Sequence, residues 1–346
     1  MNQFAQVPMK AIGPIKIVGP VVNEEVLVPL ATYEIPVWPS TNRGAKVSRE
    51  SGGIFTTLID ERMTRSFAVE ASNAAQALIV ASQLKARKAE LETVVAGCSR
   101  FAKLVDLHFQ VVGKILYVRF EFTTGDAAGH NMVTKATEQL LYWTEQQYPA
   151  LRYVSVSSNY CIDKKVSAVN GILGRGKYVV TEIIIPREVC QKTLKTTPEK
   201  IVELNTKKNL LGSIIAGSLR SANAHFANVL LAFYLATGQD AANIVEGSQG
   251  FTFAEMQGDA VYFSATLPNI IVGTIGNGKD LPFVQENLQL LGCLQARETG
   301  DNSRRLAVIC AAAVMCCELS LIAALTNPSE LMRAHVAFER NQSEVK

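Results

Sequence analysis

The order of predicted elements between residues 66 and 156 constrains the fold more than any other feature of this sequence. The residue pattern predicts, in order, a strand at 66–71, a helix at 73–95, strands at 101–112 and 115–122 around the turn Gly113-Lys114, a helix at 131–147 and a strand at 152–156. The order β-α-β-β-α-β is that of a ferredoxin-like unit. We therefore expect a small ferredoxin-like domain at residues 67–156, inserted into a larger domain.

The remainder of the chain predicts a larger, helix-rich domain. Strand-like runs lie at 26–34, 260–267 and 269–274, and helical patterns lie at 210–236 and 306–325. The predicted fold class is therefore α+β. The expected domains are a discontinuous large domain at 1–66 and 157–330, the small domain at 67–156, and a C-terminal helix or tail at 331–346.

One apolar segment, residues 306–325 (LAVICAAAVMCCELSLIAAL), is long enough to cross a bilayer. Glu318 lies in its middle, where a carboxylate would be costly in lipid. Alanine and cysteine dominate the segment, which favours a tightly packed helix inside the protein. We expect a buried helix here. The first 20 residues contain no compact apolar run, so we expect no signal peptide.

Charge and cysteine content exclude several classes of protein. The 346 residues include 34 basic and 31 acidic side chains, giving a formal net charge of +3. This balance argues against general nucleic-acid binding, which needs a strongly basic face. The seven cysteines are odd in number and form no CxxC pair, as expected for reduced thiols in the cytoplasm. The four histidines lack the spacing of zinc ligands, so we expect no metal.

Five short strings contain residue types that active sites use. They are VPLATYE with STNRG (28–34 and 40–44), GDAAGHNM (125–132), SNYCIDKK with GRGKYVV (158–165 and 174–180), KKNLLGS with NAHFANVLLAFYLATGQD (207–213 and 223–240), and ELSLIAAL with AHVAFERN (318–325 and 334–341). Each is weak alone. GDAAGHNM could hold a phosphate at a helix N-terminus, but taken alone it is better explained as a tight strand–helix turn. Because it lacks GxGxxG, a Rossmann fold is disfavoured.

Taken together and in this order, the strings resemble the catalytic domain of the 3-hydroxy-3-methylglutaryl-coenzyme A (HMG-CoA) reductase family. GDAAGHNM resembles that family's DAMGMNM, SNYCIDKK with GRGK resembles NYCTDKK with GRGK, and NAHFAN with ATGQD resembles NAHAAN with TGQD. The resemblance covers roughly residues 11–341. The SNYCIDKK loop is similar to that of the eukaryotic-like class. The triplet Asp163-Lys164-Lys165, taken by itself, would be a solvated surface feature.

The resemblance implies a four-electron reduction of HMG-CoA to mevalonate and coenzyme A, with two NADPH consumed. The implied catalytic residues are Glu34, Lys164, Asp240 and His335. A thioester carbonyl that accepts hydride develops negative charge, which the Lys164 ammonium would stabilise. Glu34 would donate a proton, a buried Asp240 would connect Glu34 to Lys164, and His335 would protonate the departing thiolate.

The resemblance also implies binding residues. The residues implied for HMG-CoA are Arg65, Ser157, Asp163, Lys165 and Lys208 at the HMG group, and Asn42 and Arg43 near the coenzyme A phosphates. Those implied for NADPH are Ser99, Arg100, Asp126, Ala127, Gly129 and Asn131. Arginine suits both tasks, because a guanidinium grips a carboxylate or a phosphate with two hydrogen bonds.

The sequence departs from the family pattern in several places. AQVPM (5–9) replaces an ENVIG-like dimer motif, EIPVWPS (34–40) replaces EGCLVAS, His130 replaces a methionine, and Asn277 replaces a glycine. The family's shared active site still implies a homodimer or larger homo-oligomer, in the cytoplasm and without a membrane or nucleic-acid partner. The alternative is a non-catalytic relative that binds an acyl-coenzyme A or a dinucleotide. The four retained catalytic positions argue against it.

Overall fold

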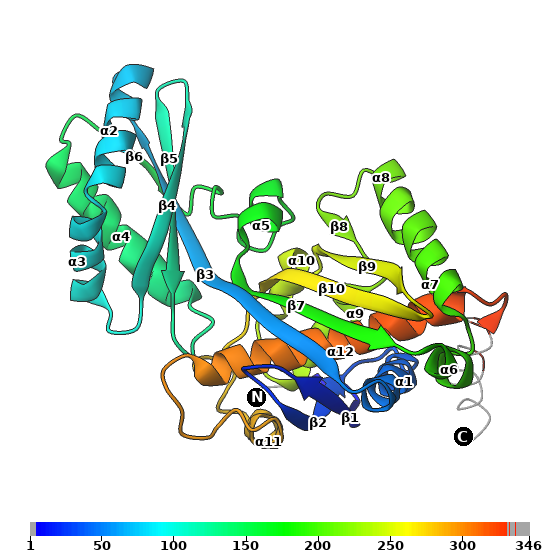
Figure 1. Ribbon diagram of the computed structural model, residues 1–346. Helices are drawn as coiled ribbons and strands as arrows, with labels where there is room; N and C mark the ends of the chain where they lie inside the picture. Colours follow the sequence, from blue (N-terminus) through cyan, green and yellow to red (C-terminus); the bar gives the residue numbers. More distant parts are fainter. Residues whose placement is uncertain (1–4, 331, 333–335, 337–346) are drawn as a thin grey trace.

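The computed structural model describes residues 5–330, 332 and 336, and it is a mixed α+β structure (Figure 1). Its main sheet has the strand order β2-β1-β3-β7-β10-β9-β8. The strands are β1 (Met9–Val18), β2 (Glu24–Ala31), β3 (Ile54–Glu70), β7 (Gly176–Ile185), β8 (Ser221–Ala222), β9 (Gly250–Gln257) and β10 (Ala260–Ile270). Neighbours are antiparallel except for the short pairings of β1 with β3 and of β8 with β9. The α+β class predicted from the sequence is confirmed.

Helices cover one side of this sheet, and the main apolar core lies between the two layers. The helices outside the small unit are α1 (Val37–Glu50), α5 (Ala168–Leu173), α6 (Arg187–Val189), α7 (Pro198–Leu204), α8 (Ser213–Ile215), α9 (Phe226–Ala236), α10 (Ile244–Gly247), α11 (Pro282–Leu290) and α12 (Asp301–Leu325). Shorter turns are π-helical at Cys190–Leu194 and Asn205–Gly212 and 3₁₀ at Ala241–Asn243. Helix α12 runs along β3, β7 and β10 and contacts α1 and α9 (Figure 1).

Helix α12 is the segment that imitates a membrane span. In the described part of the chain it alone has the length and hydropathy of a span, but 94% of its apolar window is buried inside the protein. Glu318 is fully buried on it, and its carboxylate accepts the backbone N–H groups of Ala224 and His225. The prediction of a buried core helix is confirmed.

A second unit extends from the main sheet on the far half of β3. Its strands are β4 (Lys103–Val112), β5 (Ile115–Thr123) and β6 (Arg152–Val156), and its helices are α2 (Ala74–Ala86), α3 (Lys88–Cys98) and α4 (His130–Gln147). The strand order is β6-β3-β5-β4, all antiparallel. This unit has an apolar core of its own, separate from the main one.

Strand β3 belongs to both sheets. Residues 55–62 of β3 pair with β7, and residues 63–70 pair with β5. The two cores are therefore connected by a continuous strand instead of a loop.

Four predicted elements differ from the structure. The helix expected at 210–236 is wrong: the chain leaves the helix after Ile215, forms β8, and begins α9 only at Phe226. Left-handed backbone at Gly217 (φ 69°) and Arg220 (φ 54°) breaks the helix. The helix at 73–95 is divided at Arg87. In place of the strands at 260–267 and 269–274 there is the single strand β10, which ends at Ile270 and has a register shift between Leu267 and Ile270.

Candidate active site

The loop between β6 and α5 carries most of the predicted site. Four of its residues have left-handed backbone angles, namely Ser157 (φ 62°), Asn159 (φ 65°), Ile162 (φ 43°) and Lys164 (φ 56°). Such angles are unfavourable for residues other than glycine and persist only where surrounding contacts enforce them. Strand β3 supplies some of these contacts: Thr64 Oγ1 donates to Cys161 O (3.0 Å), and Cys161 N donates to Ser66 Oγ (3.1 Å).

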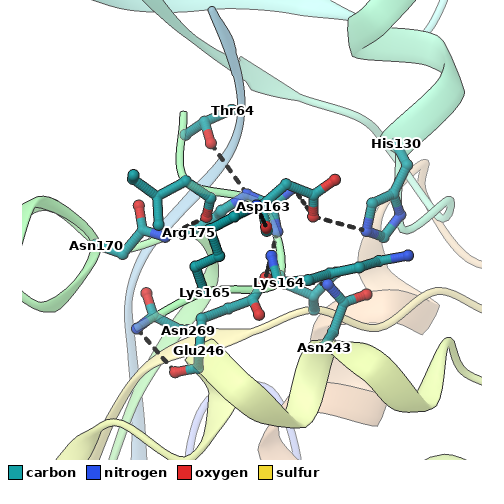
Figure 2. Close-up of polar contacts among 12 residues, drawn as sticks. Thr64, His130, Asp163, Lys164, Lys165, Asn170, Arg175, Asn243, Glu246 and Asn269 are labelled. Atoms are coloured by element: carbon teal, nitrogen blue, oxygen red, sulfur yellow. Dashed lines mark hydrogen bonds and ion pairs between the residues drawn. The ribbon is translucent and has the colours of Figure 1, made fainter. Parts of the chain in front are cut away.

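Arg175, which directly precedes β7, is the centre of the polar network around this loop (Figure 2). Its side chain is fully buried, with Nη1 2.6 Å from Glu246 Oε1, Nη2 2.9 Å from Asp163 Oδ1, and Nε donating to Thr64 Oγ1 at 3.1 Å. Burial raises the pKa of Asp163, but the positive charges around it, that of Arg175 first and then those of Arg65 and Lys164, together outweigh burial, and the pKa lies below its usual value. Asp163 is therefore an ionised carboxylate at neutral pH.

Lys164 and Asp240 form a direct ion pair, with Nζ 2.6 Å from Oδ2. The hydrogen bond to Asp240 raises the pKa of Lys164. Burial raises the pKa of Asp240, but the hydrogen bond from Lys164 and the backbone N–H of Ala242 hold it below its usual value. The ammonium therefore keeps its charge at neutral pH, as a group that stabilises an oxyanion must.

The residues implied for the HMG group gather partly around Asp163. Arg65 is largely buried; its Nη1 donates to Ser157 Oγ (3.0 Å), and its Nη2 lies 3.4 Å from Asp163 Oδ2. Lys165 is exposed and donates from Nζ to the Asp163 backbone oxygen (3.2 Å). The site thus holds two guanidinium and two ammonium groups against three carboxylates, those of Asp163, Asp240 and Glu246, a small excess of positive charge that suits an anionic ligand.

His130 brings the GDAAGHNM loop into the same site (Figure 2). It is the first residue of α4, and its Nε2 lies 3.9 Å from Asp163 Oδ1. Burial and the Arg175 charge lower its pKa to about 4. The imidazole is therefore neutral at neutral pH.

Glu34 lies in a second group of polar residues. It is exposed in the connection between β2 and α1, and Asn228 Nδ2 donates to its Oε1 (3.4 Å). Asn228 also contacts His225. The Nε2 of His225 lies 3.2 Å from Cys317 O and close to the buried carboxylate of Glu318. Lys208 donates to Asn209 Oδ1 (3.2 Å). Burial raises the pKa of Glu318, and the positive charge of Lys208 is one of the influences that oppose this rise.

The two groups are separate in the single chain. Among residues 5–330, no hydrogen bond or ion pair joins Glu34 to Lys164 or to Asp240. The expectation of a buried Asp240 that connects them is wrong for this structure, because 43% of its side chain is exposed and it pairs with Lys164 alone. His335, the fourth predicted catalytic residue, lies outside the described residues.

The residues implied for the coenzyme A phosphates are engaged within the protein. Asn42 Oδ1 accepts the backbone N–H of Gly13 (3.1 Å). The Arg43 guanidinium donates to the side chain and backbone of Ser320 and pairs with Glu330 (2.9 Å). Arg43 thereby ties α1 to the end of α12.

The GDAAGHNM loop is packed tightly against neighbouring parts of the chain. Asp126 accepts the N–H groups of Gly300 and Ser303 (both 3.0 Å) and so caps the start of α12. Ala127 forms an isolated bridge with Ile275. Gly129 has φ 95°, and a Cβ there would overlap the Thr124 side chain. Asn131 is exposed in the first turn of α4, where a helix N-terminus favours an anion.

Ser99 and Arg100 lie in the connection between α3 and β4. Ser99 Oγ accepts the N–H groups of Phe101 (3.2 Å) and Ala102 (3.0 Å), which fixes this turn. Arg100 is exposed, and its guanidinium stacks over the Phe101 ring at 5.3 Å. It is free to meet a phosphate.

One group in the described part of the chain, Asp106, His108 and Glu121, brings metal-ligand atoms within 4.8 Å of one another. Both oxygens of Glu121 already face guanidinium groups, those of Arg62 and Arg119. A cation placed there would be repelled by two positive charges.

Residue patterns missed Arg175, Glu246 and Asn243. Arg175 lies within the GRGK string but received no role, and a buried arginine is uncommon without a partner. Glu246 and Asn243 follow the GQD string and have no local signal at all. They enter the site only because α10 packs beside the 157–165 loop.

The fold and this site define an α+β protein in which a charged lysine, Lys164, is paired with Asp240 in a polar site with excess positive charge. The family model described as hydroxymethylglutaryl-coenzyme A reductase matches residues 3–340. The chain belongs to that family.

Individual relatives agree. The chain is 47% identical to a 3-hydroxy-3-methylglutaryl-coenzyme A reductase of Pyrococcus abyssi over 98% of its own length and 84% of the relative's. It is 42% identical to reductase 1 of Oryza sativa subsp. japonica, over 99% and 64% of the two lengths. A solved class II reductase of Streptococcus pneumoniae bound to NADPH shares the fold, with a TM-score of 0.75 at 20% identity over 94% of this chain and 86% of that one.

Proposed function

We propose that this chain reduces HMG-CoA to mevalonate and coenzyme A and consumes two NADPH in doing so. Membership of the reductase family supports the overall reaction. The observation that carries the proposal is the Lys164–Asp240 pair, with Asp163 of the same loop as Lys164 and Arg65 of β3 close by.

Lys164 has the chemistry for the carbonyl. When hydride reaches the thioester carbon, the carbonyl oxygen gains negative charge, and a fixed ammonium stabilises that charge more than it stabilises the substrate. Asp240 orients the ammonium and keeps it protonated. Lys164 and Asp240 belong to the same chain.

Glu34 and His335 would move protons. Glu34 would protonate the carbonyl oxygen, which requires a neutral carboxylic acid and hence a drier environment than the exposed position it has in the single chain. Bound substrate or a second subunit would supply that environment. His335 would protonate the thiolate of coenzyme A, since an imidazole can carry a proton near neutral pH.

The substrate would lie along the positive surface of the loop. Arg65 and Lys165, with Ser157, Asp163 and Lys208, would hold the carboxylate and hydroxyl of the HMG group. Asn42 and Arg43 would lie toward the coenzyme A phosphates. Arg43 would have to exchange its contact with Glu330 for a phosphate.

NADPH fits the surface between Arg100 and the GDAAGHNM loop, and supplies the hydride when bound. The start of α4 offers N–H groups to a phosphate. The exposed Arg100 would contact the ribose 2′-phosphate, with Ser99 beside it. Asp126 and Ala127 would shape the loop, and Asn131 would contact the dinucleotide.

The small unit would be an inserted ferredoxin-like domain at residues 67–156 that binds NADP. Its strand order β6-β3-β5-β4 and its separate core support this division. The large HMG-CoA-binding domain would be formed by 1–66 and 157–330, with the catalytic histidine on a C-terminal helix or tail at 331–346.

The working enzyme would be a homodimer or larger. The sheet face away from α12 exposes Phe55, Ile184 and Phe253, each more than two-fifths accessible. Phe55, Glu182, Ser264 and Phe253 are direct neighbours across four adjacent strands, so their side chains lie on one face of the sheet. Ile184 lies two residues along β7 from Glu182 and is therefore on the same face. An exposed apolar face of this kind is typical of an interface. The seven free cysteines support a cytoplasmic location.

The test is NADPH oxidation at 340 nm with HMG-CoA as the only acceptor. Lys164→Ala should reduce turnover by about 10²–10³-fold, because one oxyanion-stabilising group is lost. Lys200→Ala, on the exposed surface of α7, is the matched control and should leave turnover unchanged. A non-catalytic relative would bind NADPH or acyl-coenzyme A but show no HMG-CoA-dependent oxidation in the wild type.

A further inference from the structure

Lys164 is held at both ends by one short segment. Its ammonium pairs with Asp240, and its backbone N–H donates to Glu246 Oε1 (3.1 Å). Asp240 caps the 3₁₀ turn Ala241–Asn243, and Glu246 lies on α10, which follows directly. The segment therefore holds both the side chain and the main chain of the lysine.

A single oxygen of Glu246 accepts every hydrogen bond made to this side chain. Oε1 accepts from Lys164 N, from Arg175 Nη1 (2.6 Å) and from Asn243 Nδ2 (3.0 Å) (Figure 2). Oε2 is buried, and nothing in the described part of the chain bonds to it. The three hydrogen bonds therefore need one acceptor oxygen, at the position of Oε1. They do not need a second acceptor at Oε2.

The backbone that Glu246 holds is strained. Lys164 has φ 56° and Ile162 has φ 43°, both left-handed. The Ile162 carbonyl is held separately, by Asn170 Nδ2 (2.7 Å), and Asp163 is held by Arg175. Glu246 makes the hydrogen bond at Lys164 itself, and without it the lysine backbone would be free to relax.

We propose that Glu246 is a positioning residue for HMG-CoA reduction: its Oε1 fixes the left-handed backbone of Lys164, so that the ammonium, guided by Asp240, stands where the oxyanion forms. This role rests on the proposed function. Misplacement of a catalytic group by about 1 Å can reduce a rate by about 10²-fold, so loss of this contact should appear in kcat.

Two substitutions separate positioning from simple stability. Glu246→Ala removes the acceptor, and kcat should fall by about 10²-fold while the KM for NADPH stays within about twofold. Glu246→Gln keeps an amide oxygen for all three donors, and its kcat should stay within about tenfold of the wild type. A role limited to stability would give losses that follow the fall in Tm of both variants.

Glu61→Ala is the matched control. Glu61 is a largely buried carboxylate, with 9% of its side chain exposed, paired with Lys177 (3.6 Å) and Arg304 (2.9 Å), and in the described part of the chain it has no hydrogen bond or ion pair to the 157–165 loop. This variant should lose stability and keep its kcat. If Glu246→Ala keeps a wild-type kcat, or if Glu61→Ala loses as much kcat as Glu246→Ala, the inference is overturned.

Hydrogen exchange gives a readout that does not need activity. Peptides covering residues 157–165 should exchange faster in Glu246→Ala than in the wild type, and should be restored in Glu246→Gln. Unchanged exchange in this loop would overturn the inference even if the wild type proved inactive with HMG-CoA. A wild type without activity, but with this exchange pattern, would overturn the proposed function and leave the positioning contact standing.

Discussion

His130 stands where the family motif has a methionine, and it introduces a titratable group into a charged site. Its pKa is lowered to about 4 by burial and by Arg175. The unfolded chain, with a pKa near ~6.5, therefore binds the proton more readily than the folded chain does. Stability is unaffected by this group above about pH 6.5 and is lost as the pH falls from there toward 4.

We predict that His130→Met removes this acid sensitivity. At pH 7 the two proteins should unfold at similar urea concentrations. Between pH 7 and pH 4.5, the free energy of unfolding of the wild type should fall by about 2–3 kcal/mol more than that of the variant. This amount follows from the size of the pKa shift. Urea unfolding at both pH values measures this, and an unchanged difference would show that His130 is not shifted.

Arg100 is the residue for which we predict a change of cofactor preference. Its exposed guanidinium has no carboxylate partner in the described chain and stacks on Phe101. Arg100→Ala should raise the KM for NADPH by about tenfold, the effect of losing one charge-assisted contact, and leave the KM for NADH nearly unchanged. Equal increases for both cofactors would mean that Arg100 does not contact the 2′-phosphate.

At the scale of single residues, sequence strings located much of the loop site. Asp163 and Lys164 lie in the SNYCIDKK string, the family resemblance adds Arg65 and Ser157, and the four lie together. Glu246 could not be found in this way, because its contact with Lys164 depends on how two segments 82 residues apart pack. The motifs also could not predict which side chains are buried. Asp240 matches a buried aspartate of the family but is exposed here.

At the scale of elements, α1 packs closely against α12 at Gly44. A Cβ at Gly44 on α1 would overlap the backbone of Cys316 on α12. We predict that Gly44→Ala lowers the free energy of unfolding by about 3 kcal/mol, because neither helix backbone can yield easily. Gly97→Ala on α3, where nothing lies within 4 Å, should be neutral or stabilising by up to about 1 kcal/mol.

Chemical unfolding of the two variants measures this contrast. A Gly44→Ala protein as stable as the wild type would mean that α1 and α12 are farther apart than described.

Periodicity predicted elements well where local and long-range preferences agree. Residues 152–156 form β6 as expected, and α4 begins one residue from its predicted start. The pattern at 210–236 also predicts a helix. However, the carboxylate of Glu318 on α12 accepts the N–H groups of Ala224 and His225, which therefore cannot bond within a continuous helix. The shared strand β3 was likewise not predictable, since its partners lie in two different sheets.

At the scale of the whole molecule, the separation of Glu34 from Lys164 predicts an assembly. We expect the wild type to sediment as a dimer or larger. Ile184→Asp, on the exposed sheet face, should shift it toward monomer and reduce kcat, whereas Leu78→Asp on exposed α2 should do neither. A fully active monomer would contradict this arrangement.

The central claim concerns the reaction itself, and its most direct measurement is stoichiometry. Purified protein is given limiting HMG-CoA and excess NADPH, and NADPH consumed, free thiol released and mevalonate formed are all quantified. The account predicts two NADPH oxidised and one thiol released for each mevalonate. NADPH oxidation without mevalonate, one NADPH per thiol with an aldehyde as the end product, or no HMG-CoA-dependent oxidation at all would contradict it.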